Sequence, residues 1–261
     1  MDPRLYRRDA RPCAASVRSA SALKEPLEYA VPLETVFLDA GGVLVFPNWR
    51  RVSETLARHG VRVDADTLAR AEPHARRRLD DQQVVGATTD TSRGWLFFDL
   101  ILEKAGVANS EETRGALIEL HAYHQAHNLW EFVPDGVQPA LEALRAMGLQ
   151  LTVVSNANGT LCAHLERIGL DRYVDCVLDS WDLKVEKPDP RLFEIALERS
   201  GARRESTIHV GDLYNIDVVG ARSAGIRAVL IDEADLRPDA DCPRVQSLSE
   251  LAARIGAGEF D

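Results

Sequence analysis

The sequence contains few cysteines, and they are not spaced to hold a metal or a disulfide framework. The four, Cys13, Cys162, Cys176 and Cys242, form no Cys-x-x-Cys pair and have no histidine at metal-ligand spacing. We therefore expect reduced thiols with structural roles, which is typical of a cytoplasmic protein.

Long apolar runs and basic stripes are also absent. No run approaches the roughly 20 residues of a membrane-spanning helix, so we expect no membrane partner. The net charge of -10 gives an acidic surface that repels phosphate backbones, so we expect no nucleic-acid partner. Positive charge gathers in Arg76-Arg77-Arg78, which we interpret as the solvated face of a helix.

The first 33 residues differ in composition from the rest. Arginines are mixed with alanine and serine, and no apolar segment follows that could act as the centre of a signal peptide. Acidic residues, among them Asp2, Asp9 and Glu25, count against an organelle-targeting peptide. We expect residues 1–33 to be a disordered N-terminal extension.

Strand and helix patterns alternate along the second half of the chain. Short apolar runs suited to strands lie at 149–154, 176–178, 207–210 and 228–231, with helical patterns between them. This alternation predicts an α/β fold with a Rossmann-like parallel sheet and helices on both faces.

One more strand pattern, Thr35 to Leu38, precedes a segment that does not alternate. Residues 46–132 show helical periodicity only, which predicts a helical cap domain inserted into a core made of residues 34–45 and 133–261. Three of the four tryptophans lie in this insertion, at Trp49, Trp95 and Trp130. They either pack among the helices or line a pocket against the sheet.

Polar residues follow the ends of the predicted strands. Asp39 ends the first strand, Ser155 and Asn156 end the second, and Gly211-Asp212 ends a later one with Asp217 close behind. Lys187 lies between these motifs, in Lys-Pro-Asp-Pro. Because ligands of open α/β sheets bind at the carboxyl ends of the strands, we expect these residues to form one site.

The four motifs, in this order, resemble those of the haloacid dehalogenase superfamily, in the branch with a helical cap after the first strand. The resemblance covers about residues 34–232. It implies a Mg²⁺-dependent phosphatase in which Asp39 is the nucleophile and forms an aspartyl-phosphate. It further implies a metal site at Asp39, the Gly41 carbonyl and Asp212, with Asp217 orienting it.

The resemblance also implies which residues bind the phosphoryl group. Ser155, Asn156, Lys187 and the loop at Gly41 would contact its oxygens, and Lys187 and Ser155 would act with Asp39 in catalysis. Most phosphatases of the superfamily carry a second Asp two residues after the nucleophile, and this chain has Gly41 there. That Asp protonates the leaving group, and general acid-base help is typically worth ~10²–10⁴-fold in rate.

Three functions remain open. The favoured one is a phosphoric monoester hydrolase with altered acid-base chemistry that acts on a small phosphorylated metabolite in the cytoplasm. A second is a 2-haloacid dehalogenase, because such enzymes also lack the second Asp, although Asp212 with Asp217 looks like a metal site that they would not need. A third is a binding or regulatory protein with weakened catalysis. The substrate and the oligomeric state stay open.

Overall fold

The structure is a computed structural model that describes residues 31–88 and 90–260. Most of the expected N-terminal extension lies outside the described residues. Within them Leu33 is already buried against the core, at 8% exposure. No helix in the described part of the chain has both the length and the apolar character needed to span a membrane.

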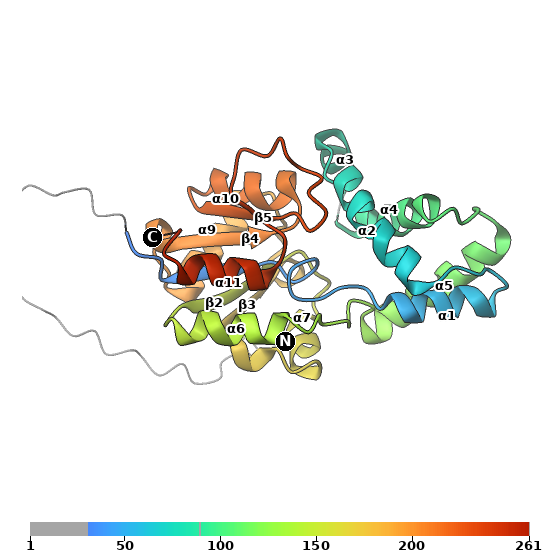
Figure 1. Cartoon of the computed structure of the whole chain (residues 1–261), viewed down its shortest axis with the longest axis horizontal. Coiled ribbons are helices and arrows are strands. Elements are labelled where there is room, and N and C mark those ends of the chain that lie inside the picture. Colours follow the sequence, from blue (N-terminus) through green and yellow to red (C-terminus); the bar gives the residue numbers. More distant parts are fainter. Residues whose placement is uncertain (1–30, 89, 261) are drawn as a thin grey trace, which may run out of the picture. The chain divides into compact units, whose positions relative to one another are not determined.

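A parallel sheet lies at the centre of the fold, as the alternation predicts (Figure 1). Its strands are β1 (Thr35–Leu38), β2 (Gln150–Ser155), β3 (Cys176–Asp179), β4 (Thr207–Gly211), β5 (Arg227–Ile231) and β6 (Arg244–Val245). Their order is β3-β2-β1-β4-β5-β6, so the strand order reverses at β1. Because Leu38 is in register with Val153 and Val210, the segments that follow β1, β2 and β4 emerge together at one edge.

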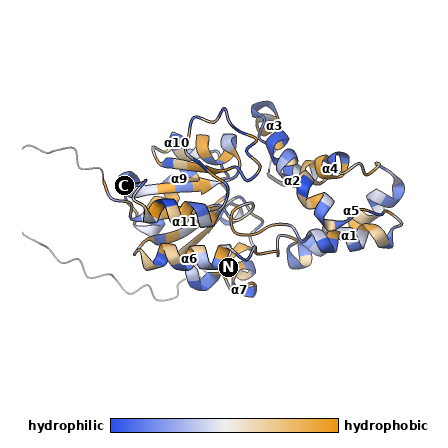
Figure 2. Ribbon diagram, viewed as in Figure 1, coloured by the Kyte–Doolittle hydropathy of each residue, from blue (hydrophilic) through white to orange (hydrophobic). Residues whose placement is uncertain are grey.

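Side chains alternate between the two faces of the sheet, as the pleat requires. Val36 and Leu38 pack on one face with α6 (Val137–Ala146), α7 (Leu161–Arg167) and α11 (Leu248–Gly256). Phe37 packs on the other with α9 (Pro190–Ser200) and α10 (Val219–Ser223). Figure 2 shows apolar and polar residues on the same helices, as expected of helices that cover a sheet.

Short helical turns connect these elements. They are η2 (Asp171–Tyr173), α8 (Ser180–Leu183), η3 (Arg204–Ser206) and the π-helix η4 (Tyr214–Val218). The last of them follows β4 almost directly and carries Asp217. β6 and α11 were not expected from the sequence.

Helices fill most of the segment between β1 and α6, as predicted. They are α1 (Trp49–Arg58), α2 (Ala65–Leu79), α3 (Gln82–Ala87), α4 (Asp90–Lys104) and α5 (Glu111–His127). α2 packs against α4 and α1 against α5, around an apolar cluster of their own that includes Leu56 and Phe98. The division into a core and a cap at residues 46 and 132 stays a prediction.

Candidate active site

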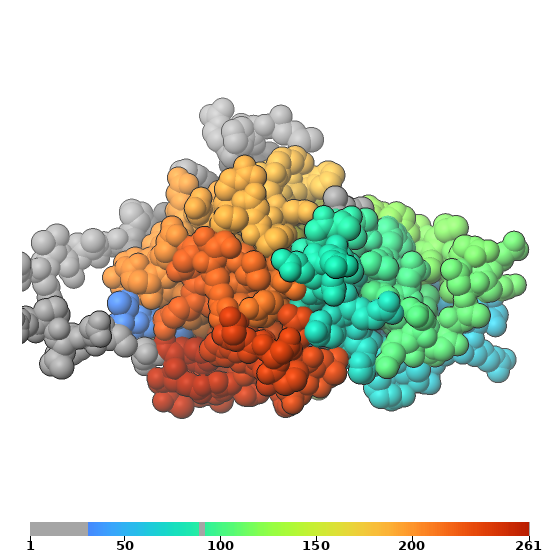
Figure 3. All heavy atoms as spheres, turned by 90° about the horizontal axis from the view of Figure 1, so that it is seen from above, coloured from blue at the N-terminus to red at the C-terminus, as the bar shows by residue number. Residues whose placement is uncertain are grey.

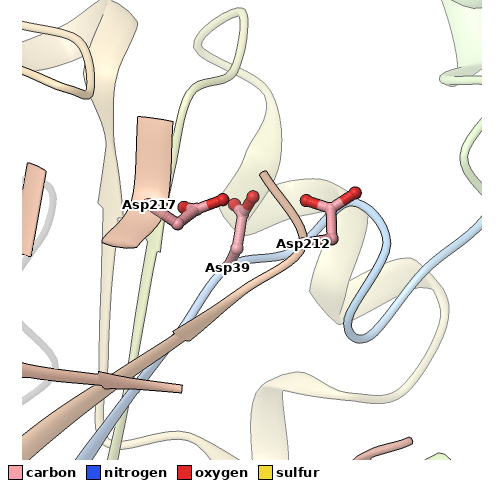
Figure 4. A group of neighbouring side chains, drawn as sticks. All are labelled: Asp39, Asp212 and Asp217. Carbon is pink, nitrogen blue, oxygen red and sulfur yellow. The ribbon is translucent and has the colours of Figure 1, made fainter. Parts of the chain in front are cut away.

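Three carboxylates meet at the edge where the strands end. Asp39 directly follows β1, Asp212 directly follows β4 and Asp217 belongs to η4. One oxygen of each lies within 4.8 Å of the others, and Asp39 lies between the other two in Figure 4. The structure thus brings together the predicted nucleophile and the predicted metal-site aspartates.

A buried lysine joins two of these carboxylates. Lys187 is 1% exposed, and its Nζ lies 2.6 Å from Asp217 Oδ1 and 3.0 Å from Asp39 Oδ1. The amide of Asn156 fixes the lysine's backbone: its Oδ1 accepts from the Lys187 N–H at 2.7 Å, and its Nδ2 donates to the Lys187 carbonyl at 3.0 Å. Asn156 therefore holds Lys187 in place, so its side-chain amide is already engaged.

Ser155 ends β2 beside the same group of residues and is 4% exposed. Its hydroxyl makes a long contact, 3.4 Å, to the Asn156 carbonyl, and it also hydrogen-bonds Asp39, which acts to lower the pKa of that carboxyl group. On the other side of the site the Ala40 N–H donates to Asp39 Oδ1 at 2.8 Å. Three donors, this N–H, Lys187 and the Ser155 hydroxyl, thus orient the Asp39 carboxylate.

Burial and charge act differently on the three aspartates. Burial would raise the pKa of Asp217, but Lys187 and a hydrogen bond from His209 outweigh it and hold the pKa below its usual range. Burial raises the pKa of Asp39 although Lys187 opposes it, and raises the pKa of Asp212 to about 8 although Arg76 opposes it. At Asp39 and Asp212 the nearby cationic side chains, Lys187 and Arg76, therefore do not outweigh the effect of burial on the carboxylate.

This donor set fits a hard divalent cation. Every candidate ligand atom is an oxygen, which is what Mg²⁺ prefers, and the two carboxylates with raised pKa are the ones that a cation would stabilise. Asp217 differs, because Oδ1 accepts from Lys187 and His209 and Oδ2 accepts from the Leu213 N–H at 3.0 Å. Its oxygens already hold the surrounding residues in place.

His209 is a site residue that the sequence analysis missed. It is fully buried in β4, and its Nε2 lies 3.0 Å from Asp217 Oδ1. Burial lowers the pKa of His209, so we assign a neutral ring that donates from Nε2 to the ionised Asp217. The sequence did contain a signal for this residue, because His209 is a histidine within an otherwise apolar strand pattern.

The interpretation of Arg76 as part of a solvated face is wrong. Its side chain is 12% exposed, and its Nε lies 3.4 Å from Asp212 Oδ2. It also pairs with Glu72, one turn earlier on α2, whose other oxygen accepts from Trp49 Nε1 at 2.7 Å. This face of α2 carries the buried Ala75 and turns toward the sheet, so it is not the solvent-facing side.

The end of α2 is also bonded to the segment after β4. The Asn215 N–H donates to Asp80 Oδ1 at 2.6 Å, and Asn215 Nδ2 donates to the Asp80 carbonyl at 2.5 Å. Arg237 Nη1 lies 3.0 Å from the other Asp80 oxygen. In Figure 3 the blue-green atoms of α2 and α3 accordingly lie against orange atoms of the C-terminal half.

Two adjacent glycines in the loop after Asp39 are not equivalent. Gly42 has φ +73°, and a Cβ there would lie 2.2 Å from Asp212 Oδ2, so only glycine fits. Gly41 has a φ outside the left-handed range, and its Cβ would meet Trp130 Nε1 at an ordinary 3.6 Å. Glycine is therefore required at 42, whereas at 41 there is room for a side chain.

A cavity of about 510 Å³ opens from the strand ends toward α4 and α5. Its strand-end side carries the predicted site residues, except for the deeply buried Asp217: Asp39, Gly41, Ser155, Asn156, Lys187 and Asp212. Trp95 on α4 and Trp130 beside Gly41 also line the cavity, whereas Trp49 packs among the helices. Both interpretations of the tryptophans thus hold, for different residues.

This fold and this set of residues place the chain in a known family. A family model described as haloacid dehalogenase-like hydrolase matches residues 33–225, and the chain belongs to this family. The expected resemblance at the family level is confirmed.

Individual relatives span part of the chain. A haloacid dehalogenase-like hydrolase domain-containing protein 3 of Danio rerio is 38% identical over 54% of this chain, and the match spans 61% of that protein. A ribulose-1,5-bisphosphate 5-phosphatase of Halopiger xanaduensis is 32% identical over 68% of this chain and 75% of its own length. The crystal structure of a 2-haloacid dehalogenase from Pseudomonas syringae aligns with a TM-score of 0.54 and 27% identity, over 87% of this chain and 99% of that one.

Proposed function

We propose that this protein is a Mg²⁺-dependent phosphoric monoester hydrolase that acts on a small phosphorylated metabolite. The observation that carries the proposal is the pairing of Asp39 with the buried Lys187, 3.0 Å apart, beside a second carboxylate, Asp212, that could hold a metal ion together with Asp39. The relative named as a ribulose-1,5-bisphosphate 5-phosphatase supports a phosphorylated substrate of this size.

In the proposed reaction Asp39 attacks phosphorus, because its carboxylate is oriented by Lys187 and the Ala40 N–H. The bond from phosphorus to the ester oxygen breaks, and the alkoxide or phenoxide leaves with a proton from solvent. Water then attacks the aspartyl-phosphate, which releases phosphate and restores Asp39. Lys187 and the Ser155 hydroxyl hold the phosphoryl oxygens as negative charge develops on them.

Mg²⁺ would be held by Asp39, the Gly41 carbonyl and Asp212, and it would supply positive charge that lets an anionic nucleophile approach an anionic ester. Asp217 would support the metal site without binding the ion. It accepts hydrogen bonds from Lys187 and from the Leu213 N–H, and so positions Lys187 and the backbone that follows Asp212. No carboxylate stands at position 41, so we propose that the rate depends strongly on the leaving group.

The dehalogenase alternative fits this site less well. A 2-haloacid is itself an anion, and it would have to bind beside Asp39, Asp212 and Asp217 with Lys187 already shared between two of them. Attack on carbon needs no metal, so that reaction gives no use for the cluster of oxygen ligands that Asp39 and Asp212 offer. The aligned dehalogenase structure supports the shared fold and does not decide the reaction.

The remaining expectations carry over as parts of this proposal. Residues 46–132 form a cap whose helices close over the substrate, and residues 34–45 with 133–261 form the catalytic core. The protein works in the cytoplasm. A chain that binds phosphorylated ligands without turnover is the alternative that the following experiment separates.

The test is hydrolysis of para-nitrophenyl phosphate with Mg²⁺ and with EDTA, by the wild type and by Asp39→Asn. We expect turnover that needs both the metal and Asp39. The matched control is Asp182→Asn, which removes an exposed carboxylate outside the site and should leave the rate unchanged. Activity that survives Asp39→Asn would show that the nucleophile is another residue, and a wild type without turnover would leave only ligand binding.

A further inference from the structure

Trp130 lies between the two ends of the cavity. Its Nε1 is 3.6 Å from the place that a Cβ of Gly41 would take, two residues after the proposed nucleophile. Its ring also packs against Phe97 and Phe98 of α4, with centroids 5.9 and 5.7 Å away, and against His124 of α5, 5.3 Å away. Trp130 therefore connects the strand-end part of the cavity with the part formed by the helices.

The backbone of Trp130 is fixed by hydrogen bonds on both sides. Its N–H donates to Asn128 Oδ1 at 3.0 Å, and its carbonyl accepts from His164 Nε2 at 2.7 Å. These are the hydrogen bonds of Trp130 to described residues, and neither engages the indole N–H. A donor that is held in place before a ligand arrives needs little reorganisation when charge develops beside it.

The direction of attack brings the ester oxygen of a bound substrate toward this N–H. In an in-line displacement the leaving oxygen is on the side of phosphorus opposite the attacking oxygen. The attacking oxygen belongs to Asp39, beside which the buried Lys187 and Asp217 close the site. The leaving group must therefore extend into the cavity, past Gly41 and Trp130. Its first atom beyond phosphorus is the ester oxygen.

An indole N–H donates a hydrogen bond but does not give up its proton. When the bond from phosphorus breaks, its electron pair goes to the ester oxygen, where the N–H can stabilise the negative charge without neutralising it. Position 41 is a glycine and supplies no proton either. The leaving group therefore departs as an anion that solvent protonates afterwards. This suits the oxygen of a phenol, whose pKa is about 10, far better than that of an aliphatic alcohol.

Much of the cavity wall near α4 and α5 is apolar. The apolar residues there include Trp95, Phe97, Phe98, Leu117, Leu120 and Leu129. A sugar would turn hydroxyl groups toward this surface, where an unpaired hydroxyl group costs free energy. An aromatic ring would bury apolar area there and pack against the aromatic side chains. With about 510 Å³, the cavity has room for such a ring beyond the phosphoryl group.

We propose that Trp130 is a catalytic residue whose indole N–H donates to the leaving oxygen, and that the substrate is an aryl phosphate. Two separate observations favour this class of substrate, because position 41 offers no proton and the wall offers apolar and aromatic surface. The inference rests on the proposed function and adds to it a donor for the leaving group and the chemistry of the substrate's body.

The first test measures how hydrolysis depends on the leaving group. Phenyl phosphate and a series of ring-substituted relatives up to para-nitrophenyl phosphate are compared on the wild type, Trp130→Phe and Trp95→Phe. For phenyl phosphate, Trp130→Phe should lower kcat/KM about 10- to 100-fold, as the loss of a hydrogen bond to a charged oxygen predicts. The loss should be much smaller for para-nitrophenyl phosphate, whose oxygen is a weaker base, so the dependence on leaving-group pKa becomes steeper.

Trp95→Phe is the matched control, because it removes an indole N–H from the same wall but not one that lies beside Gly41. Its dependence on leaving-group pKa should stay that of the wild type. If Trp130→Phe lowers all rates by one factor, or leaves them unchanged, the catalytic role is overturned, since a structural role predicts a uniform loss.

The second test measures binding, so that it does not depend on turnover. Calorimetry with Mg²⁺ on Asp39→Asn compares phenyl phosphate with benzylphosphonate, in which a methylene group replaces the ester oxygen, at a pH where both are dianions. Phenyl phosphate should bind about 2- to 10-fold more tightly, as one neutral hydrogen bond allows, and adding Trp130→Phe should remove this preference. A preference that survives Trp130→Phe overturns the contact.

The class of substrate is tested on the same Asp39→Asn protein. Naphthyl phosphate should bind at least about 10-fold more tightly than glucose 1-phosphate, because its ring buries apolar area that the sugar lacks. Equal binding, or tighter binding of the sugar phosphate, overturns the assignment to aryl phosphates.

Failure of the proposed function would look different. A protein that hydrolyses para-nitrophenyl phosphate but shows neither effect of Trp130→Phe keeps the function and lacks the leaving-group donor. A protein without turnover whose preference for the ester oxygen disappears in Trp130→Phe has this contact and a different function.

Discussion

Restoring a carboxylate at position 41 is the sharpest test of how this site works. Gly41→Asp needs no left-handed backbone, and its Cβ would sit 3.6 Å from Trp130 Nε1 and 3.7 Å from Cδ1, both ordinary contacts. The indole N–H is a ready donor to the new side chain. Because the position lies beside Asp39 and Asp212, repulsion should raise the pKa of the new carboxyl and favour its acid form.

The expected gain follows from what a general acid contributes. For alkyl phosphates, whose leaving groups need a proton, kcat/KM should rise by ~10²–10⁴-fold. For para-nitrophenyl phosphate, whose leaving group departs without one, it should change little. The assay is a series of aryl and alkyl phosphates spanning leaving-group pKa, in which the wild type shows a steep dependence and Gly41→Asp a shallow one.

Gly41→Ala is the matched control, since it adds the same Cβ without a carboxyl group. It should leave the whole series close to the wild type. If Gly41→Asp accelerates alkyl phosphates no more than Gly41→Ala does, or raises aryl and alkyl rates equally, the missing proton donor is not what limits this site.

Two further predictions concern stability. Lys187→Met leaves two buried carboxylates without their shared cation, so the free energy of unfolding in urea should fall by about 3–5 kcal/mol. The control is Lys184→Met, an exposed change nearby in the chain, which should shift this free energy by less than about 0.5 kcal/mol. Equal effects of the two changes would contradict the pairing of Lys187 with the carboxylates. Burial raises the pKa of Asp80 to about 6. The folded state therefore binds this proton more tightly than the unfolded chain, whose carboxyl titrates near pKa 3.9, and the free energy of unfolding should fall by up to about 3 kcal/mol as the pH rises from about 4 to 6. Urea titrations across this range should show that Asp80→Asn removes that part of the slope, and an unchanged slope would refute the assignment.

The strand-end motifs could be predicted because each combines two local signals. A short apolar run gives a strand, and the polar residue directly after it must lie at the carboxyl edge of a parallel sheet. β6, with two residues, is too short to give a periodic signal.

The wall that α4 and α5 contribute to the cavity could not be predicted in the same way. Which face of a helix is buried follows from its periodicity, but which neighbour it is buried against depends on packing between helices. Arg76 shows this, because three consecutive arginines suggest solvent while one of them reaches Asp212. Arg93 shows it as well, because nothing in its sequence context indicates that it is buried and lines the cavity.

The bonds between Asp80 and Asn215 have a mechanical consequence. Asn215 lies between Asp212 and Asp217 in the chain, so the end of α2 is attached to the segment that carries both carboxylates. A displacement of α2 would pull on this segment and on Arg76 at once. One movement of α2 would then change both the access to the cavity and the alignment of the carboxylates. A ligand that holds α2 in place would therefore also fix the catalytic geometry.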